Sequence, residues 1–254
     1  MATSEHAVSF SLEGKVVVLV GASAGIGEWM AAGLDAAGAT LVLGARRLEQ
    51  LEAVAAPLND AVAVKCDITD DGDRQALIQT ALDRHGRIDG LVNNAGVFNV
   101  MPATKETPDV FRSSFEVNVF GPMELMRLAL QSMRTTGGGS MVNVTSASAN
   151  RTLGANTPAA SYCASKAALA HLTRELAMQW GRYGVRVNSV APGFFDTAMT
   201  GNNGAPPHWA ENQFAIKRLS RGADMVGAVQ YLLSDASSYI TGTEIAVDGG
   251  QSKS

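Results

Sequence analysis

Tyr162 and Lys166 are the two residues of this chain whose types and spacing point most directly to chemistry. They stand four positions apart in the run SYCASK, and on a helix this spacing places both side chains on one face. An ammonium group beside a phenol favours the ionised phenol and so lowers its pKa from about 10. Such a phenol can give a proton to a carbonyl oxygen or take one from an alcohol. The pair alone is weak evidence, because this spacing is frequent on helix surfaces.

Two further polar groups stand beside apolar runs. Ser146 and Ser148 follow the strand-like run SMVNVT in the segment VTSASA. A hydroxyl there can hydrogen-bond a substrate oxygen; Ser146 is the favoured residue and Ser148 the alternative. Asn118 lies among apolar residues in EVNVFGP, where a buried amide must find hydrogen-bond partners. Asn118 is therefore either a site residue or a core amide that bends its helix.

A glycine-rich loop, GASAGIG at 21–27, follows the first strand-like run and opens the first helical stretch. Glycines let the backbone turn sharply and approach a pyrophosphate, whose charge is stabilised at a helix N-terminus. The spacing is Gly-x-x-x-Gly-x-Gly rather than Gly-x-Gly-x-x-Gly. A turn without a ligand is the alternative, but ligands of open α/β sheets bind where this loop lies.

The end of the second strand-like run indicates which dinucleotide is bound. An NAD-binding fold usually carries a carboxylate there, whereas this chain reads GARR at 44–47. Arg46 can pair with a 2′-phosphate, because an arginine fork matches phosphate geometry. NADP(H) is therefore predicted over NAD(H), the alternative being that Arg46 and Arg47 are only solvated. Asp67 in CDIT either accepts a hydrogen bond from adenine or caps the next helix, a role that suits Thr69 or Asp70 better.

The hydrophobic pattern predicts an α/β fold. Strand-like runs that are apolar almost throughout are typical of a parallel sheet buried on both faces; they lie at 15–21, 40–45, 61–66, 88–93, 140–145, 185–191 and 243–247. Helical stretches alternate with them, at 24–37, 47–57, 70–85, 108–134, 159–182 and 221–234. This alternation predicts a doubly wound parallel sheet with helices on both faces, in a single domain over 1–254. The Gly/Asn/Pro-rich segment within 196–215 is predicted to be a lid loop over the substrate.

Composition excludes several classes of protein. The 254 residues are 46% hydrophobic and 17% charged, with a net charge of −4 and the signs mixed. No basic patch suggests nucleic acid, and no apolar window is long enough for a membrane span. The two cysteines, Cys66 and Cys163, fit a reducing compartment, and the N-terminal run does not look like a secretory signal. The four histidines lack metal-ligand spacing, so we expect a cytoplasmic enzyme without a metal.

Over residues 10–250 the chain resembles the short-chain dehydrogenase/reductase family. The resemblance is carried by elements that occur in the expected order: GASAGIG, NNAG at 93–96, Asn118, Ser146, Tyr162 with Lys166, PGFFDT at 192–197 and ITGTEIAVDGG at 240–250. It implies a Rossmann fold of seven parallel strands and hydride transfer with a nicotinamide cofactor. One departure is the gap of 16 residues from Ser146 to Tyr162, which is longer than usual in the family; Ser148 would give 14.

The resemblance also implies roles for individual residues. Tyr162 would be the acid/base, Lys166 would also hold the nicotinamide ribose, Ser146 would orient the carbonyl, and Asn118 would fix a water. Thr197 would contact the carboxamide. The expected cofactor-binding residues come from the matching motifs and from the ends of the second and third strands: Gly21, Ser23, Gly25, Ile26, Gly27, Arg46, Arg47, Asp67, Ile68, Asn94, Ala95, Gly96, Tyr162, Lys166, Pro192, Gly193, Phe195 and Thr197.

The substrate is less well specified. Residues of the predicted rim and lid are mainly apolar or aromatic, namely Val97, Phe98, Val100, Leu153, Phe194, Phe195, Met199, His208 and Trp209. If they face the substrate, a medium-sized apolar or aromatic ketone or alcohol fits best; otherwise they only exclude water. The alternatives are a 3-oxoacyl-(acyl carrier protein) reductase, whose partner would need a basic patch, and a polyol or sugar-acid dehydrogenase. A dinucleotide-binding sensor without catalysis is disfavoured, because all four expected catalytic positions are filled.

Two long helical stretches, 108–134 and 159–182, carry more apolar residues than one stripe against a sheet requires. A helix with such a surplus is usually buried against a second partner. Related enzymes commonly pair these helices across a two-fold axis and join two dimers through the last helix and strand, here 221–250. We therefore expect a homotetramer, with a homodimer as the alternative.

Overall fold

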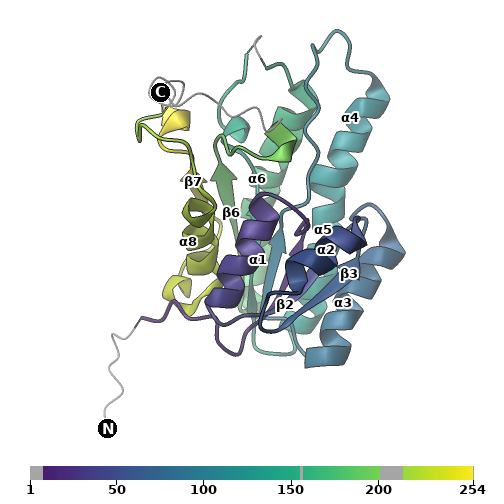
Figure 1. The fold of residues 1–254 in the computed structure, drawn as a ribbon, viewed down its shortest axis with the longest axis vertical. Helices are drawn as coiled ribbons and strands as arrows, with labels where there is room; N and C mark the ends of the chain where they lie inside the picture. Colours follow the sequence, from purple (N-terminus) through teal and green to yellow (C-terminus); the bar gives the residue numbers. More distant parts are fainter. Residues whose placement is uncertain (1–7, 155–156, 201–213, 254) are drawn as a thin grey trace.

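A seven-stranded, entirely parallel sheet forms the centre of the molecule (Figure 1). The computed structural model describes residues 8–154, 157–200 and 214–253. The strand order is β3-β2-β1-β4-β5-β6-β7, with the strands β1 Val16–Val20, β2 Thr40–Ala45, β3 Ala61–Lys65, β4 Gly90–Asn93, β5 Gly139–Val144, β6 Val185–Pro192 and β7 Glu244–Val247. Every strand predicted from the sequence is present. The predicted doubly wound α/β fold is confirmed.

The helices also follow the prediction, with one interruption. They are α1 Ile26–Ala36, α2 Leu48–Ala55, α3 Asp71–His85, α4 Pro108–Phe115, α5 Gly121–Met133, α6 Ala160–Trp180 and α8 Gly222–Leu233. Between α4 and α5 the chain forms a π-helical turn, η1 Glu116–Phe120, so the stretch predicted at 108–134 is continuous but not regular. Short 3₁₀ turns are η2 Ala147–Ala149, η3 Gly181–Tyr183, η4 Ala198–Thr200, η5 Asp235–Ser237 and η6 Gln251–Lys253.

Alternate residues of the strands pack into two separate cores. Val17 and Leu19 of β1 face the core under α1, α2 and α8, while Val18 and Val20 face the core under α3, α5 and α6. Side chains alternate along a strand, and here both faces are covered. The strands therefore read as continuous apolar runs.

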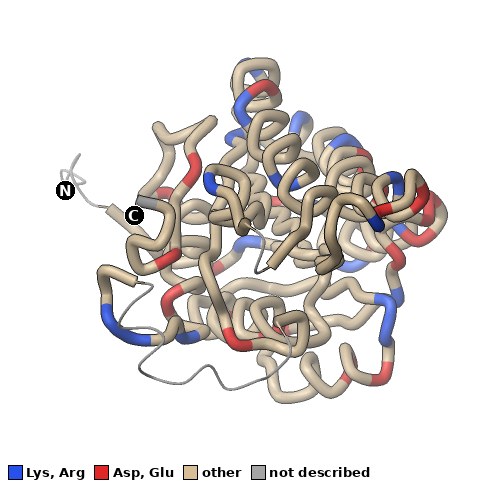
Figure 2. Tube along the Cα trace, turned by 90° about the horizontal axis from the view of Figure 1, so that it is seen from above, with Lys and Arg blue, Asp and Glu red and all other residues tan. Residues whose placement is uncertain are grey.

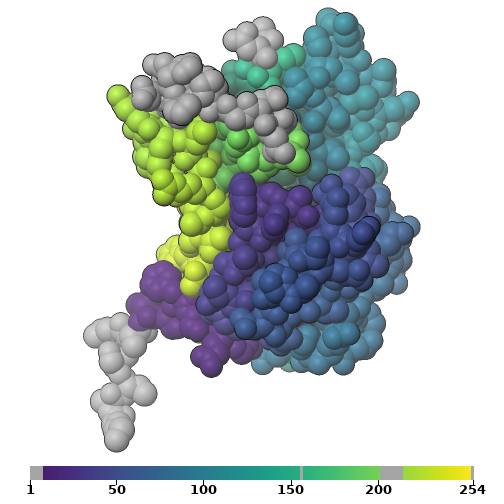
Figure 3. All heavy atoms as spheres, viewed as in Figure 1, coloured from purple at the N-terminus to yellow at the C-terminus, as the bar shows by residue number. Residues whose placement is uncertain are grey.

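Segments far apart in the sequence meet along one side of the sheet. The C-terminal part of the chain packs beside the N-terminal part (Figure 3), where Gln230 donates a hydrogen bond to the Phe10 carbonyl and α8 lies against α1. β1 and β4 are neighbours in the sheet. From β1 the chain adds β2 and β3 on one side, and from β4 it adds β5, β6 and β7 on the other side, so the direction of strand addition reverses between β1 and β4. In open α/β sheets this switch point, at the carboxyl ends of the strands, is where ligands bind.

The surplus of apolar residues on the long helices is only partly used inside the chain. Leu125 and Leu176 are fully or almost fully buried in the core. Phe111 on α4, Phe120 on η1 and Met178 on α6 are exposed, Met178 to 82%. No helix in the described ranges is long and apolar enough to cross a membrane.

Candidate active site

A groove along the carboxyl edge of the sheet gathers most of the residues predicted to bind a dinucleotide. It begins at the end of β2, passes the loops after β1 and β4, and ends at α6. The predicted residues that line it are Gly21, Ser23, Gly25, Ile26, Arg46, Arg47, Asp67, Ile68, Asn94, Ala95, Gly96, Tyr162, Lys166, Pro192 and Thr197. Three predicted binding residues do not line it: Gly27, Gly193 and Phe195. The side chain of Phe195 is buried in the core, tilted against the ring of Trp29.

The glycine loop is shaped by close backbone contacts. Gly21 and Gly25 have φ values of 82° and 58°, in the left-handed region that favours glycine. A Cβ on Gly27 would lie 2.0 Å from the Gly21 carbonyl oxygen, so Gly27 permits the loop to fold onto itself. Asn94, which follows β4, donates to the same carbonyl at 2.7 Å. These contacts fix the loop between β1 and α1 in the conformation in which it lines the groove.

The end of β2 presents cations to one end of the groove. Arg46 and Arg47 are exposed, and Arg47 donates to the Ser23 hydroxyl at 3.2 Å. Burial alone would raise the pKa of the Asp67 carboxyl, but hydrogen bonds from Thr69 and the charge of Arg46 outweigh it and lower the pKa. The helix that follows is capped by Asp70, which accepts from the Asp73 amide at 2.8 Å. Asp67 is therefore not the cap and faces the groove.

Tyr162 lies half-buried at the other end of the groove. The ring of Phe98 packs edge-on against it with ring centroids 4.7 Å apart, and the Lys166 nitrogen lies 5.9 Å from the centroid of the tyrosine ring. Burial raises the pKa of the Tyr162 phenol, although a hydrogen bond with Ser146 acts in the opposite direction. The expectation of a lowered phenol pKa is thus wrong for the protein without ligands, because burial disfavours the phenolate.

Lys166 is buried, with 4% of its surface exposed. Its ammonium group donates to the carbonyl of Val144, the last residue of β5, at 2.8 Å. Burial lowers the pKa of Lys166 to about 8. Gly96, after β4, lies beside this charge: a Cβ there would lie 3.4 Å from the Lys166 nitrogen and 3.3 Å from Asn118 Oδ1.

Asn118 lies in the π-helical turn and is fully buried. Its Oδ1 accepts from the Val97 amide at 2.9 Å, and its Nδ2 donates to the Val97 carbonyl at 3.1 Å and to the Ser165 hydroxyl at 2.9 Å. The side chain therefore ties the segment after β4 to α6. These contacts are those of a core amide in an irregular helical turn, and the site role of Asn118 stays a prediction.

Ser146 lies between Tyr162 and Ser148. Its hydroxyl oxygen accepts from the Ser148 hydroxyl at 2.9 Å and from the Ser148 amide at 3.2 Å, and it also hydrogen-bonds with Tyr162. The Ser148 side chain has a second hydrogen bond, with Cys163. The two serines are thus not equivalent: Ser146 contacts the phenol and Ser148 supports Ser146.

Two glutamates that sequence analysis missed hold this site in place. Glu106 accepts from the Ser161 amide at 3.1 Å and from its hydroxyl at 2.7 Å, so it caps α6, whose own N-cap residue, Ala159, makes no side-chain cap. Glu244 accepts from the Thr145 hydroxyl at 2.6 Å and so ties the start of the serine segment to β7. Each contact joins residues more than 50 positions apart. The spacing of neighbouring residues in the sequence therefore does not predict such pairs.

Comparison with known proteins identifies the family. The family model described as enoyl-(acyl carrier protein) reductase matches residues 21–252. Together with its relatives, this match shows that the chain belongs to the short-chain dehydrogenase/reductase family. The chain is therefore an oxidoreductase of the alcohol dehydrogenase and ketoreductase kind.

Several relatives are similar over nearly their full lengths. The chain is 36% identical to meso-2,3-butanediol dehydrogenase of Serratia marcescens, over 95% of this chain and 96% of the relative. It is 34% identical to 7alpha-hydroxysteroid dehydrogenase of Escherichia coli, over 94% of each chain. A solved structure of 7alpha-hydroxysteroid dehydrogenase, complexed with NADH and 7-oxo glycochenodeoxycholic acid, superposes with a TM-score of 0.89, 33% identity and 95% coverage of both chains.

The contacts of the two serines predict different effects of removing their hydroxyls. Ser146→Ala removes the group that touches the phenol, so we expect turnover to fall by about tenfold or more, in the range of hydrogen bonds to reacting groups. Ser148→Ala leaves that contact in place and should cost clearly less. Steady-state kinetics of both variants with one ketone checks the ranking, and the reverse order would transfer the role to Ser148.

Proposed function

We propose that this enzyme interconverts a ketone and a secondary alcohol by hydride transfer with NADP(H), and that Tyr162 is its general acid/base. The observation that carries the proposal is the single groove at the carboxyl edge of the sheet. Its one end presents Arg46 and the glycine loop, and its other end presents Tyr162 and Lys166. A dinucleotide lying along this groove would reach from the arginine to the phenol.

The residues present fit such a dinucleotide. Glycines with positive φ leave backbone amides beside the N-terminus of α1 free of Cβ atoms, which suits a pyrophosphate. Arg46, which is exposed and makes none of the ion pairs found in the described ranges, would hold a 2′-phosphate. Asp67 would face the adenine, and Thr197 the nicotinamide. When bound, the reduced nicotinamide supplies a hydride to the carbonyl carbon.

The proton chemistry falls to the chain's own residues. A phenol whose pKa is raised by burial is held as the protonated form at neutral pH, ready to donate to a carbonyl oxygen. Ser146 contacts that phenol and would hold the same carbonyl oxygen. Lys166, at 5.9 Å from the ring, would stabilise the phenolate left after donation.

An apolar carbonyl compound of medium size is the substrate that the described rim favours. Phe98 packs directly on Tyr162, and Leu153 lines the neighbouring pocket. A relative of similar fold, 7alpha-hydroxysteroid dehydrogenase, forms a complex with NADH and the oxo compound 7-oxo glycochenodeoxycholic acid. The predicted lid cannot be included, since its residues 201–213, among them His208 and Trp209, lie outside the described residues.

An acyl carrier protein is less well supported as a partner. Along the backbone seen from above in Figure 2, positions of Lys and Arg are interspersed with positions of Asp and Glu. Of the arginines that could form a basic patch, Arg134 and Arg182 both lie over the ring of Tyr183, at 4.4 and 4.7 Å. A small-molecule substrate therefore remains the proposal.

Removal of the phenol oxygen tests the proposed acid/base directly. Tyr162→Phe keeps the ring that packs on Phe98 and removes the proton donor, so we expect turnover to fall by at least about 100-fold with dinucleotide affinity retained. Ketone-dependent oxidation of NADPH and fluorescence titration of the dinucleotide measure the two effects. Tyr239→Phe is the matched control, because Tyr239 is fully exposed; a Tyr162→Phe variant as active as this control would rule out the assignment.

Arg46 should determine the choice of dinucleotide. Because its guanidinium is the proposed partner of the 2′-phosphate, Arg46→Asp should reverse the preference from NADP(H) toward NAD(H). The ratio of kcat/KM with NADPH and NADH measures this in the unmodified protein, in Arg46→Asp and in Arg84→Asp, a variant of another exposed arginine. Equal or better turnover of the unmodified protein with NADH would contradict the prediction.

The exposed apolar residues on α4, η1 and α6 support a homotetramer. Phe120 is 53% exposed, and such side chains grouped on adjacent helices are typical of an interface. Light scattering at micromolar concentration should give about four times the single-chain mass of 26.5 kDa. Phe120→Arg should lower this mass, whereas a mass near 26.5 kDa for the unmodified protein would exclude the assembly.

A further inference from the structure

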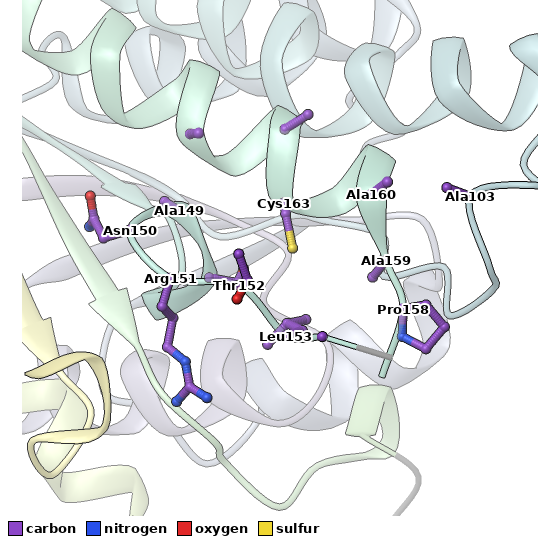
Figure 4. Close-up of a pocket in the computed structure, with 14 residues that line it drawn as sticks. Ala103, Ala149, Asn150, Arg151, Thr152, Leu153, Pro158, Ala159, Ala160 and Cys163 are labelled. Atoms are coloured by element: carbon purple, nitrogen blue, oxygen red, sulfur yellow. The ribbon is translucent and has the colours of Figure 1, made fainter. Parts of the chain in front are cut away.

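A pocket between the end of β5 and the start of α6 contains a single charged residue, Arg151. The pocket has a volume of about 590 Å3, and its other lining residues are six alanines, Leu153, Pro158 and Gly154, together with the uncharged polar residues Ser148, Asn150, Thr152 and Cys163. Figure 4 shows Cys163 pointing from α6 toward Thr152 and Leu153 across this space. Arg151 is half-exposed, so its guanidinium is accessible to a ligand from solvent.

This pocket adjoins the proposed catalytic residues. Ser148 lines it, and the Ser148 hydroxyl donates to Ser146 at 2.9 Å. Cys163 also lines the pocket, and it directly follows Tyr162 in α6. A substrate whose carbonyl lies at Ser146 and Tyr162 can therefore extend the rest of its body toward this pocket.

The guanidinium of Arg151 has unused hydrogen-bonding capacity. Its Nη1 donates to the backbone carbonyl of Gln251 at 3.3 Å, which is a long bond and uses one of five N–H donors. No carboxylate in the described parts of the chain forms an ion pair with it. Figure 4 shows the Arg151 side chain extending from its loop in the direction away from Cys163.

We propose that Arg151 binds a carboxylate of the substrate, so that the preferred substrates are ketones with an apolar body and a distant acid group. This inference rests on the proposed ketone reduction and names its substrate class. A planar guanidinium presents two parallel N–H groups that match the two oxygens of a carboxylate. The alanines, Leu153 and Pro158 would contact the apolar body between the two polar ends.

The chain length between Ser146 and Arg151 limits the size of such a substrate. Five residues span at most about 18 Å when fully extended, and three of these residues form the turn η2, which rises only about 2 Å per residue. The length of the arginine side chain adds to this backbone span, so the carbonyl and the carboxylate should be separated by several carbon atoms, and the optimal number is left to the chain-length series below. Oxo acids of five to ten carbons, with the ketone next to the terminal methyl, cover this range.

The test compares each of these oxo acids with its methyl ester. The unmodified enzyme should reduce the acids with a kcat/KM about tenfold to hundredfold higher than the esters, the range for hydrogen bonds to charged groups, with an optimum at one chain length. Arg151→Gln should remove this preference, mainly through KM, and leave the esters within about twofold. Arg151→Lys should keep part of it because the charge remains, and Arg84→Gln, on the exposed end of α3, should keep all of it.

A binding measurement without turnover separates this proposal from the proposed function. Calorimetry should detect binding of hexanoate, octanoate or decanoate to the unmodified enzyme, and at least tenfold weaker binding to Arg151→Gln. Acids that bind in this way, while neither the oxo acids nor other ketones are reduced, would overturn ketone reduction and leave the carboxylate site standing. Acids that bind no better than their esters, or an Arg151→Gln variant that weakens acids and esters alike, would overturn the carboxylate site.

Discussion

The hydrogen bond from the Lys166 ammonium to the Val144 carbonyl joins the helix that carries the site to the end of a central strand. This hydrogen bond holds the ammonium inside the protein. Burial disfavours the charged form of Lys166 and lowers its pKa to about 8. The same burial raises the pKa of Tyr162. Burial thus favours the neutral forms of both side chains. The charge of a bound ligand would therefore change the pKa of each group strongly.

The fold provides the rigid frame that this buried pair requires. Gly96 lies beside the ammonium, Asn118 fixes the segment after β4 to α6, and Glu106 caps α6. Glu244 holds the segment that leads to Ser146. These contacts all come from elements on the β4 side of the topological switch point, where parallel strands end together.

The architecture could be predicted because its signal is local. Strands buried on both faces form apolar runs in the sequence, and the intervals between them are helical, so the seven strands and the α-helices of the described chain were expected, whereas the π-helical turn within 108–134 and the 3₁₀ turns were not. The spacing of Tyr162 and Lys166 likewise survives in the structure, because a helix converts four positions into one face. The glycine loop was predictable from its place after the first strand.

The features of the site that the sequence did not predict depend on contacts between residues far apart in the chain. The cap by Glu106 and the tether by Glu244 join segments more than 50 positions apart, and Phe195 packs on Trp29 instead of facing the groove. A lowered pKa was expected for Tyr162, whereas burial raises it. The spacing in the sequence indicates a neighbouring lysine but does not indicate how deeply the two residues are buried. Burial decides the sign, and burial is a property of the whole fold.

A titration of the Tyr162 phenol tests most directly whether a buried phenol at this groove is the acid/base. The absorbance of tyrosinate near 295 nm, taken as the difference between the unmodified protein and Tyr162→Phe, isolates this group. The account predicts a pKa above about 10 in the free protein, because burial favours the neutral phenol, and a lower value once NADP+ is bound, because its positive charge favours the phenolate. A phenol that titrates below 10 without ligand, or whose pKa does not change on addition of NADP+, would contradict it.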